Sequence, residues 1–105
     1  MNIIEITSEE ARRMVKDEDT ILVDVRTPTE FELYRVEEGN VVNIPLDELK
    51  ENHPDLKKYR RILCICRTNR RSTEAARILG LLGFDRVYVV KDGVVGWLNM
   101  IDKNQ

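Results

Sequence analysis

A chain of 105 residues, with 42% hydrophobic and 34% charged side chains, is long enough to bury a core and has the composition of an ordinary globular protein. Its formal net charge of −2 creates no field that would recruit nucleic acid or an anionic membrane, so we expect neither as a partner. No apolar run approaches the roughly 18 residues of a membrane span, and no secretory signal opens the chain. Two cysteines are too few for a disulfide framework, so we expect a cytoplasmic protein. No repeat or Pro/Gly linker divides the sequence, so we expect a single domain over residues 1–105.

Strand and helix signals alternate in the first half of the chain. Ile3–Ile6 is a short apolar run that predicts a strand, and Thr7 with Glu10 has the form of a capping box that opens a helix. Ile21–Val25 is an apolar run with one acid, Asp24, near its end, which is typical of a strand buried on both faces. Thr27–Glu30 repeats the capping pattern with a proline at the first helical position, so we interpret Glu30 as a cap and not as a catalytic acid.

The second half continues the alternation. It predicts three strands, at Val41–Ile44, Arg61–Cys66 and Val87–Val90. Between and after them it predicts a broken polar helical stretch at Leu46–Lys58, a helix at Ser72–Leu82 closed by Gly83, and a short last helix at Val94–Ile101. Strands that alternate with helices predict an α/β domain with a mostly parallel sheet. Such sheets bind ligands beyond the carboxyl ends of their strands, and Cys66 lies at such an end.

Cys66 is followed by a polar loop and then by a helix that we expect to begin at Ser72. The loop must curl so that its backbone N–H groups converge over the sulfur, and the positive end of the helix points at the same place. Both effects favour the thiolate, which is the reactive form of cysteine. Arg67, Arg70 and Arg71 add positive charge near a partly exposed sulfur. Because cations oppose the dipole at a helix N-terminus, we expect an anion to accompany them.

The remaining polar candidates have structural interpretations. We expect Cys64 to be a small buried hydrophobe within its strand. Asp24 and Arg26, at the end of the second long strand, are interpreted as a structural pair that supports the site from nearby. His53 is interpreted as a loop residue and not as a general base. It is also too distant in sequence to complete a zinc site with the cysteines, so we expect neither a metal nor a cofactor.

Four segments, taken in order and spacing, resemble the signatures of the single-domain rhodanese family over most of the chain, from about Ile3 to Met100. The first resembles the Asp-Val-Arg and Glu-Phe signature, the second the Ile-Asn-Ile-Pro stretch, the third the active loop and the fourth the closing glycine and tryptophan signature. These segments are Leu22–Phe31, Val42–Leu46, Cys66–Ser72 and Gly83–Trp97.

The resemblance implies a five-stranded parallel sheet flanked by helices on both faces. It also implies a thiosulfate sulfurtransferase in which Cys66 is the catalytic nucleophile and carries a persulfide. The donor would be a small anion such as thiosulfate, or a persulfide, and the acceptor a thiol or a protein. The substrate-binding loop would comprise Arg67, Thr68, Asn69, Arg70, Arg71 and Ser72, with the amides from Arg67 to Arg71 holding the persulfide.

Two segments depart from the family pattern. The loop carries Asn69 where glycine is common and Arg70 where asparagine is common. Because asparagine tolerates the left-handed backbone conformation, we expect the loop to close nonetheless. The segment Tyr34–Val41 is rewritten and longer than usual, which suggests a loop shaped for a particular partner.

Two alternatives remain beside sulfur transfer. A cysteine phosphatase or arsenate reductase needs a Cys-x5-Arg cradle, but Ser72 occupies the arginine position and Arg71 falls one residue short. A non-catalytic rhodanese-like binding module typically lacks the cysteine, which this chain retains. Transfer from thiosulfate and persulfide relay to a protein both fit this sequence.

Overall fold

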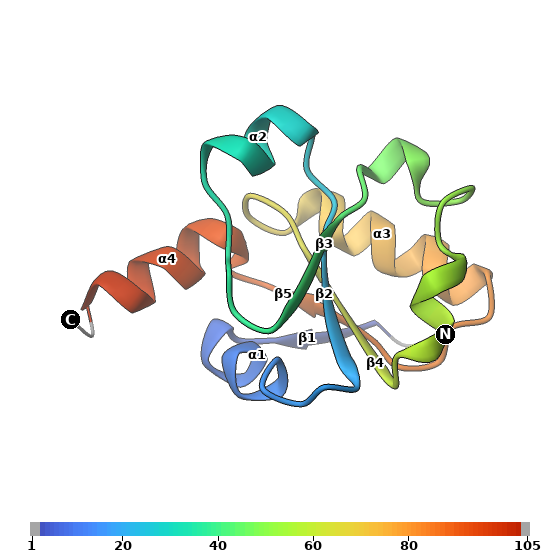
Figure 1. Cartoon of the computed structure of the whole chain (residues 1–105), viewed down its shortest axis with the longest axis horizontal. Coiled ribbons are helices and arrows are strands. Elements are labelled where there is room, and N and C mark those ends of the chain that lie inside the picture. The colour runs from blue at the N-terminus through green and yellow to red at the C-terminus, as the bar shows by residue number, and fades with distance from the viewer. Residues whose placement is uncertain (1–2, 104–105) are drawn as a thin grey trace.

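A sheet of five parallel strands lies at the centre of residues 3–103, which are the residues that the computed structural model describes (Figure 1). The strands are β1 (Ile4–Ile6), β2 (Thr20–Asp24), β3 (Asn40–Asn43), β4 (Arg61–Ile65) and β5 (Val87–Val90). Their order in the sheet is β1-β5-β4-β2-β3, and every adjacent pair is parallel. The central strand is therefore β4, which leads directly into Cys66.

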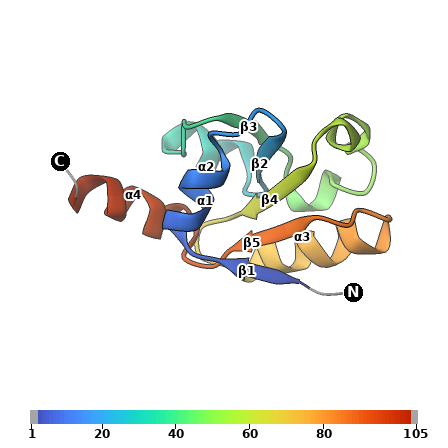
Figure 2. The same ribbon diagram turned by 90° about the horizontal axis from the view of Figure 1, so that it is seen from below.

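Helices cover both faces of the sheet, which confirms the predicted fold class. They are α1 (Ser8–Met14), α2 (Pro28–Leu33), α3 (Arg70–Leu81) and α4 (Gly93–Lys103), together with the short 3-10 helices η1 (Leu46–Glu48) and η2 (Pro54–Lys58). One core cluster packs α3, η1 and η2 against the sheet, and a second packs α1 and α4 against the opposite face (Figure 2). Helix α2 has no buried residue and follows the carboxyl end of β2.

The alternation of side chains along β4 decides on which face the sulfur lies. Ile62 and Cys64 belong to the cluster with α3, whereas Leu63 and Ile65 belong to the cluster with α1 and α4. Successive residues of a strand point to opposite faces. Cys66 continues this alternation and packs in the cluster with α3.

The capping signals predicted the starts of α1 and α2, whereas the apolar spacing misplaced the start of α3. Both capping boxes are present: Glu10 N–H donates to Thr7 Oγ1 at 3.1 Å, and Glu30 N–H donates to Thr27 Oγ1 at 3.2 Å. The prediction that α3 begins at Ser72 was wrong, because the helix begins at Arg70. The spacing of apolar residues indicates only the buried turns of a helix. The first two residues of α3 are arginines, which extend the helix because of their good helix propensity but do not belong to the apolar pattern.

The rewritten segment 34–41 is tied into the protein interior. Val36 is 2% exposed and packs in the cluster with Trp97. The Glu38 carboxylate accepts hydrogen bonds from Trp97 Nε1 at 2.8 Å and from Arg12 Nε at 2.9 Å, and so joins α4 to α1. Gly39 has φ +74° and faces the backbone of Val15, where a side chain would not fit. The structure therefore gives this segment an internal role in packing.

We expect the Glu38→Ala variant to lower the free energy of unfolding by about 1–3 kcal/mol, because the buried Trp97 N–H would lose its acceptor. Glu37 is the matched control, since its side chain is 76% exposed and pairs only distantly with Arg35. Urea unfolding followed by circular dichroism measures both variants. Equal unfolding free energies for Glu38→Ala and Glu37→Ala would contradict the structural role of Glu38.

Candidate active site

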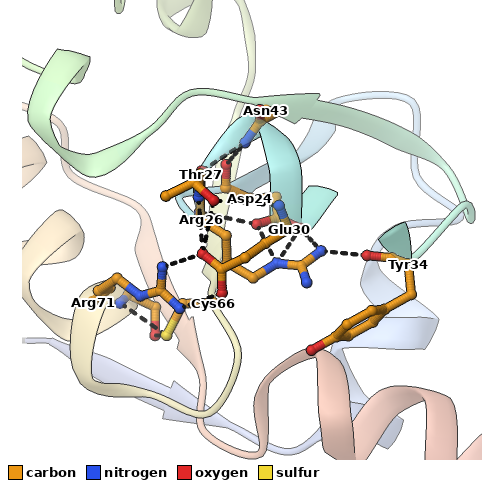
Figure 3. A network of polar contacts seen from close by, with 9 residues as sticks. Asp24, Arg26, Thr27, Glu30, Tyr34, Asn43, Cys66 and Arg71 are labelled. Carbon is orange, nitrogen blue, oxygen red and sulfur yellow. Dashed lines mark hydrogen bonds and ion pairs between the residues drawn. The ribbon is translucent and has the colours of Figure 1, made fainter. Parts of the chain in front are cut away.

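Cys66 directly follows β4, and the residue is 1% exposed. The expectation of a partly exposed sulfur was wrong, because the following loop and α3 cover the thiol. The Ser72 N–H donates to Cys66 Sγ at 3.4 Å, and the Ser72 hydroxyl oxygen lies 3.5 Å from the same sulfur. Figure 3 shows Cys66 close to Arg71. That hydroxyl in turn donates to Asn69 O at 2.9 Å. The sulfur therefore lies at the first turn of α3, where the helix end is positive.

The loop between Cys66 and α3 leaves its amides free. None of the five N–H groups from Arg67 to Arg71 donates a hydrogen bond to an acceptor within residues 3–103. The carbonyls of Cys66 and Arg67, in contrast, accept hydrogen bonds from Val94 N–H at 2.8 Å and Val95 N–H at 3.3 Å. Successive free amides beside a helix N-terminus form a site for an anion.

Asn69 closes the loop without the left-handed conformation that we expected. Its φ is −152°, and no residue other than glycine has a positive φ in the part of the chain that the structure describes. Asn69 instead precedes the first residue of α3, where its carbonyl accepts hydrogen bonds from Thr73 N–H at 2.9 Å and Thr73 Oγ1 at 2.8 Å. Because the helix starts earlier than predicted, the loop needs no residue with positive φ.

The anion expected beside the loop arginines is, for Arg71, a carboxylate of the protein. Glu30 accepts two hydrogen bonds from the Arg71 guanidinium, at 2.6 and 2.9 Å. These hydrogen bonds lower the pKa of Glu30 to about 2 and raise the pKa of Arg71. Glu30 is thus the predicted cap of α2 and also the anchor of Arg71. Arg67 and Arg70 are exposed and have no ion-pair partner within the described ranges.

The predicted Asp24–Arg26 pair is present and buried. Arg26 Nε donates to Asp24 Oδ1 at 2.9 Å, and Arg26 Nη2 donates to Asp24 Oδ2 at 2.8 Å. Burial disfavours the charge of Arg26, but the hydrogen bonds and charge of Asp24 outweigh it and raise the pKa of Arg26. Arg26 Nη2 also donates to Tyr34 O at 2.7 Å, and Asn43 Nδ2 donates to Asp24 O at 2.9 Å. Tyr34 and Asn43, which sequence reasoning missed, therefore brace the carboxyl end of β2.

Cys64 is a buried residue within β4, as the sequence predicted. It is fully buried, and burial, followed by the proximity of Cys66, raises the pKa of the Cys64 thiol to about 12. His53 lies in a different part of the fold, with Nδ1 3.0 Å from Leu49 O and its ring edge-on to Phe84.

Across residues 3–103, no three potential metal ligands gather. Within the same residues no helix has the length and apolar composition of a membrane span.

Pocket volume does not mark the site. A pocket of about 500 Å³ lined by Ile62, Phe84 and Arg86 lies at the amino end of β4 and β5, at the opposite end of the sheet from Cys66. A second depression of about 510 Å³ reaches Arg71 and Ile78 but is not lined by Cys66. Cys66 is therefore identified as the candidate site by the free amides and the positive charges of the loop that follows it, and not by a cavity.

Residues 7–100 match the family described as Rhodanese-like domain, and the chain belongs to that family. A sulfurtransferase of Allochromatium vinosum is 30% identical over 94 residues, which cover 89% of this chain and 86% of the relative. A putative sulfur carrier protein, YrkF of Bacillus subtilis, is 35% identical over 97 residues, which cover 91% of this chain but only 51% of the relative. A rhodanese-related protein of Thermoplasma volcanium has a similar structure, with a TM-score of 0.80, 27% identity and 92% of each chain covered. These relatives group the chain with the rhodanese-like sulfurtransferases.

The Glu30–Arg71 pair predicts an acid-dependent loss of stability. The Glu30 pKa lies below its ordinary value of 4.5, so the contribution of the pair is complete above about pH 5 and disappears as the pH falls toward 2. Both side chains are about one third exposed, which limits that contribution to about 1–2 kcal/mol. We expect the free energy of unfolding of Glu30→Gln to be lower than that of the parent by this amount at pH 7. The two free energies should converge near pH 2.

Urea unfolding at a series of pH values measures this difference. Glu74→Gln is the control, because Glu74 also pairs with an arginine, Arg77, but on an exposed surface of α3. We expect a smaller effect from that change at every pH. A difference between parent and Glu30→Gln that stays constant from pH 7 to pH 2 would refute the assigned role of the ion pair.

Proposed function

We propose that Cys66 accepts a sulfane sulfur as a persulfide and passes it to a thiophilic acceptor. The observation that carries this proposal is the position of Cys66, at the end of the central strand, with the Ser72 N–H on its sulfur and a following loop whose five amides are free within the described chain. A persulfide adds a second sulfur to Sγ and is anionic, so it needs donors beyond those that contact the thiol. The amides from Arg67 to Arg71 supply such donors directly after the buried sulfur.

With thiosulfate as donor, the Cys66 thiolate attacks the outer sulfur of the donor. A new S–S bond forms, the S–S bond of thiosulfate breaks, and sulfite leaves with the bonding electron pair. An acceptor such as cyanide or a thiolate then attacks the outer sulfur of the persulfide. Thiocyanate or a new persulfide forms, and the Cys66 thiolate is restored without any external oxidant or reductant.

The charges around the loop support an anionic donor. Arg67 and Arg70 are exposed and unpaired in the described chain, whereas Arg71 and Arg26 are each committed to a carboxylate. Two free cations thus flank the loop of a protein whose formal net charge is −2. Such local charge attracts small anions from solution and is screened by salt. We assign donor capture to Arg67 and Arg70, with Arg71 holding the loop through Glu30.

The structure offers less support for the two alternatives. A phosphatase needs a bidentate arginine over the bound phosphate, but Arg71 already makes its bidentate contact to Glu30. A binding module has no need of a cysteine beneath free amides. Because the transfer cycle requires a reduced Cys66, we expect the protein to work in the cytoplasm.

Substitution of the cysteines tests the assignment. We expect Cys66→Ser to abolish thiosulfate:cyanide sulfur transfer and the gain of one sulfur atom in the intact mass after incubation with thiosulfate. Cys64→Ala is the control, since Cys64 is a buried strand residue, and it should keep both properties despite a loss of stability. Sulfur transfer that survives in Cys66→Ser would overturn the proposal. Hydrolysis of an aryl phosphate that depends on Cys66 would favour the phosphatase instead.

Replacement of both free arginines tests donor capture. We expect Arg67→Ala/Arg70→Ala to raise the KM for thiosulfate by about fivefold to tenfold, since each exposed charge contributes up to about 1 kcal/mol. Added salt should raise the KM of the parent more than that of the variant. Arg77→Ala, on the exposed surface of α3, is the matched control and should leave the KM unchanged. A KM and salt response equal to those of the parent would assign the two arginines to another role.

A further inference from the structure

Gly93, the first residue of α4, packs directly against the backbone of the loop that follows Cys66. Its φ is +65°, and a Cβ atom at this position would lie 2.3 Å from Arg67 O and 2.4 Å from Thr68 O. Both atoms belong to the backbone, which cannot rotate aside as a side chain does. Any L side chain at position 93 therefore has to displace the loop.

The next two residues of α4 fix the orientation of the same loop. Val94 N–H donates to Cys66 O, and Val95 N–H donates to Arg67 O. In a trans peptide unit the C=O bond and the following N–H bond point in opposite directions, and no peptide bond between residues 3 and 103 is cis. The N–H groups of Arg67 and Thr68 consequently point away from α4. The carbonyl of Thr68 faces Gly93, so the N–H of Asn69 points away from α4 as well.

The sulfur and α4 lie on opposite faces of the sheet. Val94 and Trp97 of α4 pack in the cluster on one face of the sheet, whereas Cys66 packs with α3 on the opposite face. The Ser72 N–H of α3 approaches Sγ from that face. Helix α4 thus holds the carbonyls of the loop, and the amides point away from α4, which covers the face opposite to Cys66.

We propose that Gly93 is a positioning residue that sets the direction of the loop amides beside Cys66. This inference rests on the proposed function in one respect, namely that the amides stabilise an anionic sulfur at Cys66. A side chain at position 93 would push the carbonyls of Arg67 and Thr68 toward the sulfur. Carbonyl oxygens repel an anion, so both the thiolate and the persulfide would become less stable.

Gly93→Ala tests the proposal, with Gly83→Ala as a matched control. Gly83 has φ +98°, so alanine there has the same kind of backbone strain, but its Cβ would meet no atom within 4 Å. We expect both variants to have a lower Tm. Only Gly93→Ala should slow the alkylation of Cys66 by iodoacetamide at pH 7, move the pH profile of that alkylation to higher pH, and lower kcat for sulfur transfer by about tenfold or more.

A second pair of variants leaves Gly93 intact. Val95→Pro removes the N–H that donates to Arg67 O, in the first turn of α4, where no hydrogen bond within the helix is lost. Val95→Ala keeps the N–H and serves as the control. We expect Val95→Pro to slow the alkylation of Cys66 by about threefold, as for the loss of one modest hydrogen bond, and Val95→Ala to leave the rate unchanged.

The proposal is overturned if Gly93→Ala and Gly83→Ala, both folded by circular dichroism, show the same alkylation profile and the same kcat. If Gly93→Ala does not fold, equal alkylation rates for Val95→Pro and Val95→Ala overturn it. Alkylation reports on the Cys66 sulfur without any sulfur donor. A failure of the proposed sulfur transfer would appear in the Cys66→Ser experiment and is therefore distinguishable from a failure of this inference.

Discussion

The loop after β4 divides its peptide groups between two helices, and the candidate site depends on that division. Its first carbonyls are bonded to the amides that open α4, while the first turn of α3 supplies the amide that reaches Cys66 Sγ. A trans peptide cannot turn its carbonyl one way without turning the next amide the other way. The direction of the first three loop amides is thus a consequence of how α4 starts, and it requires no special side chain in the loop itself.

The arginines of the site also fall into two groups, those that form ion pairs within the protein and those that remain unpaired among residues 3–103. Arg26 is buried with Asp24 and binds the backbone of Tyr34, and Arg71 is held by Glu30, 41 residues earlier in the chain. These two arginines brace the carboxyl ends of the central strands. The loop cations that remain unpaired among the described residues are Arg67 and Arg70. Mutation of all the arginines together would therefore mix a loss of stability with a loss of anion attraction.

The fold was predictable from the sequence because its signals are local. Capping boxes at Thr7 and Thr27 and the apolar run before Cys66 depend only on neighbouring residues, and the structure contains each of them. The contacts that shape the site join distant segments. Neither the pairing of Glu30 with Arg71 nor the approach of Gly93 to the loop leaves a periodic pattern. Glu30 was predicted as a cap because that role spans three residues, whereas its second role spans 41.

The burial of Cys66 has a consequence for the proposed sulfur transfer. The residue is 1% exposed, so large reactants cannot reach Sγ while the loop is closed, and buried thiols are protected from oxidation. A persulfide places its outer sulfur about 2 Å beyond Sγ. Because Cys66 is packed within the core cluster and the following loop is exposed, the outer sulfur would lie closer to the loop amides and to Arg67 and Arg70 than Sγ does. Under the proposed function, the transferable sulfur is thus more accessible than the thiol that carries it. A small anion can load the site, and a larger thiol or protein can unload it without contacting Cys66 Sγ.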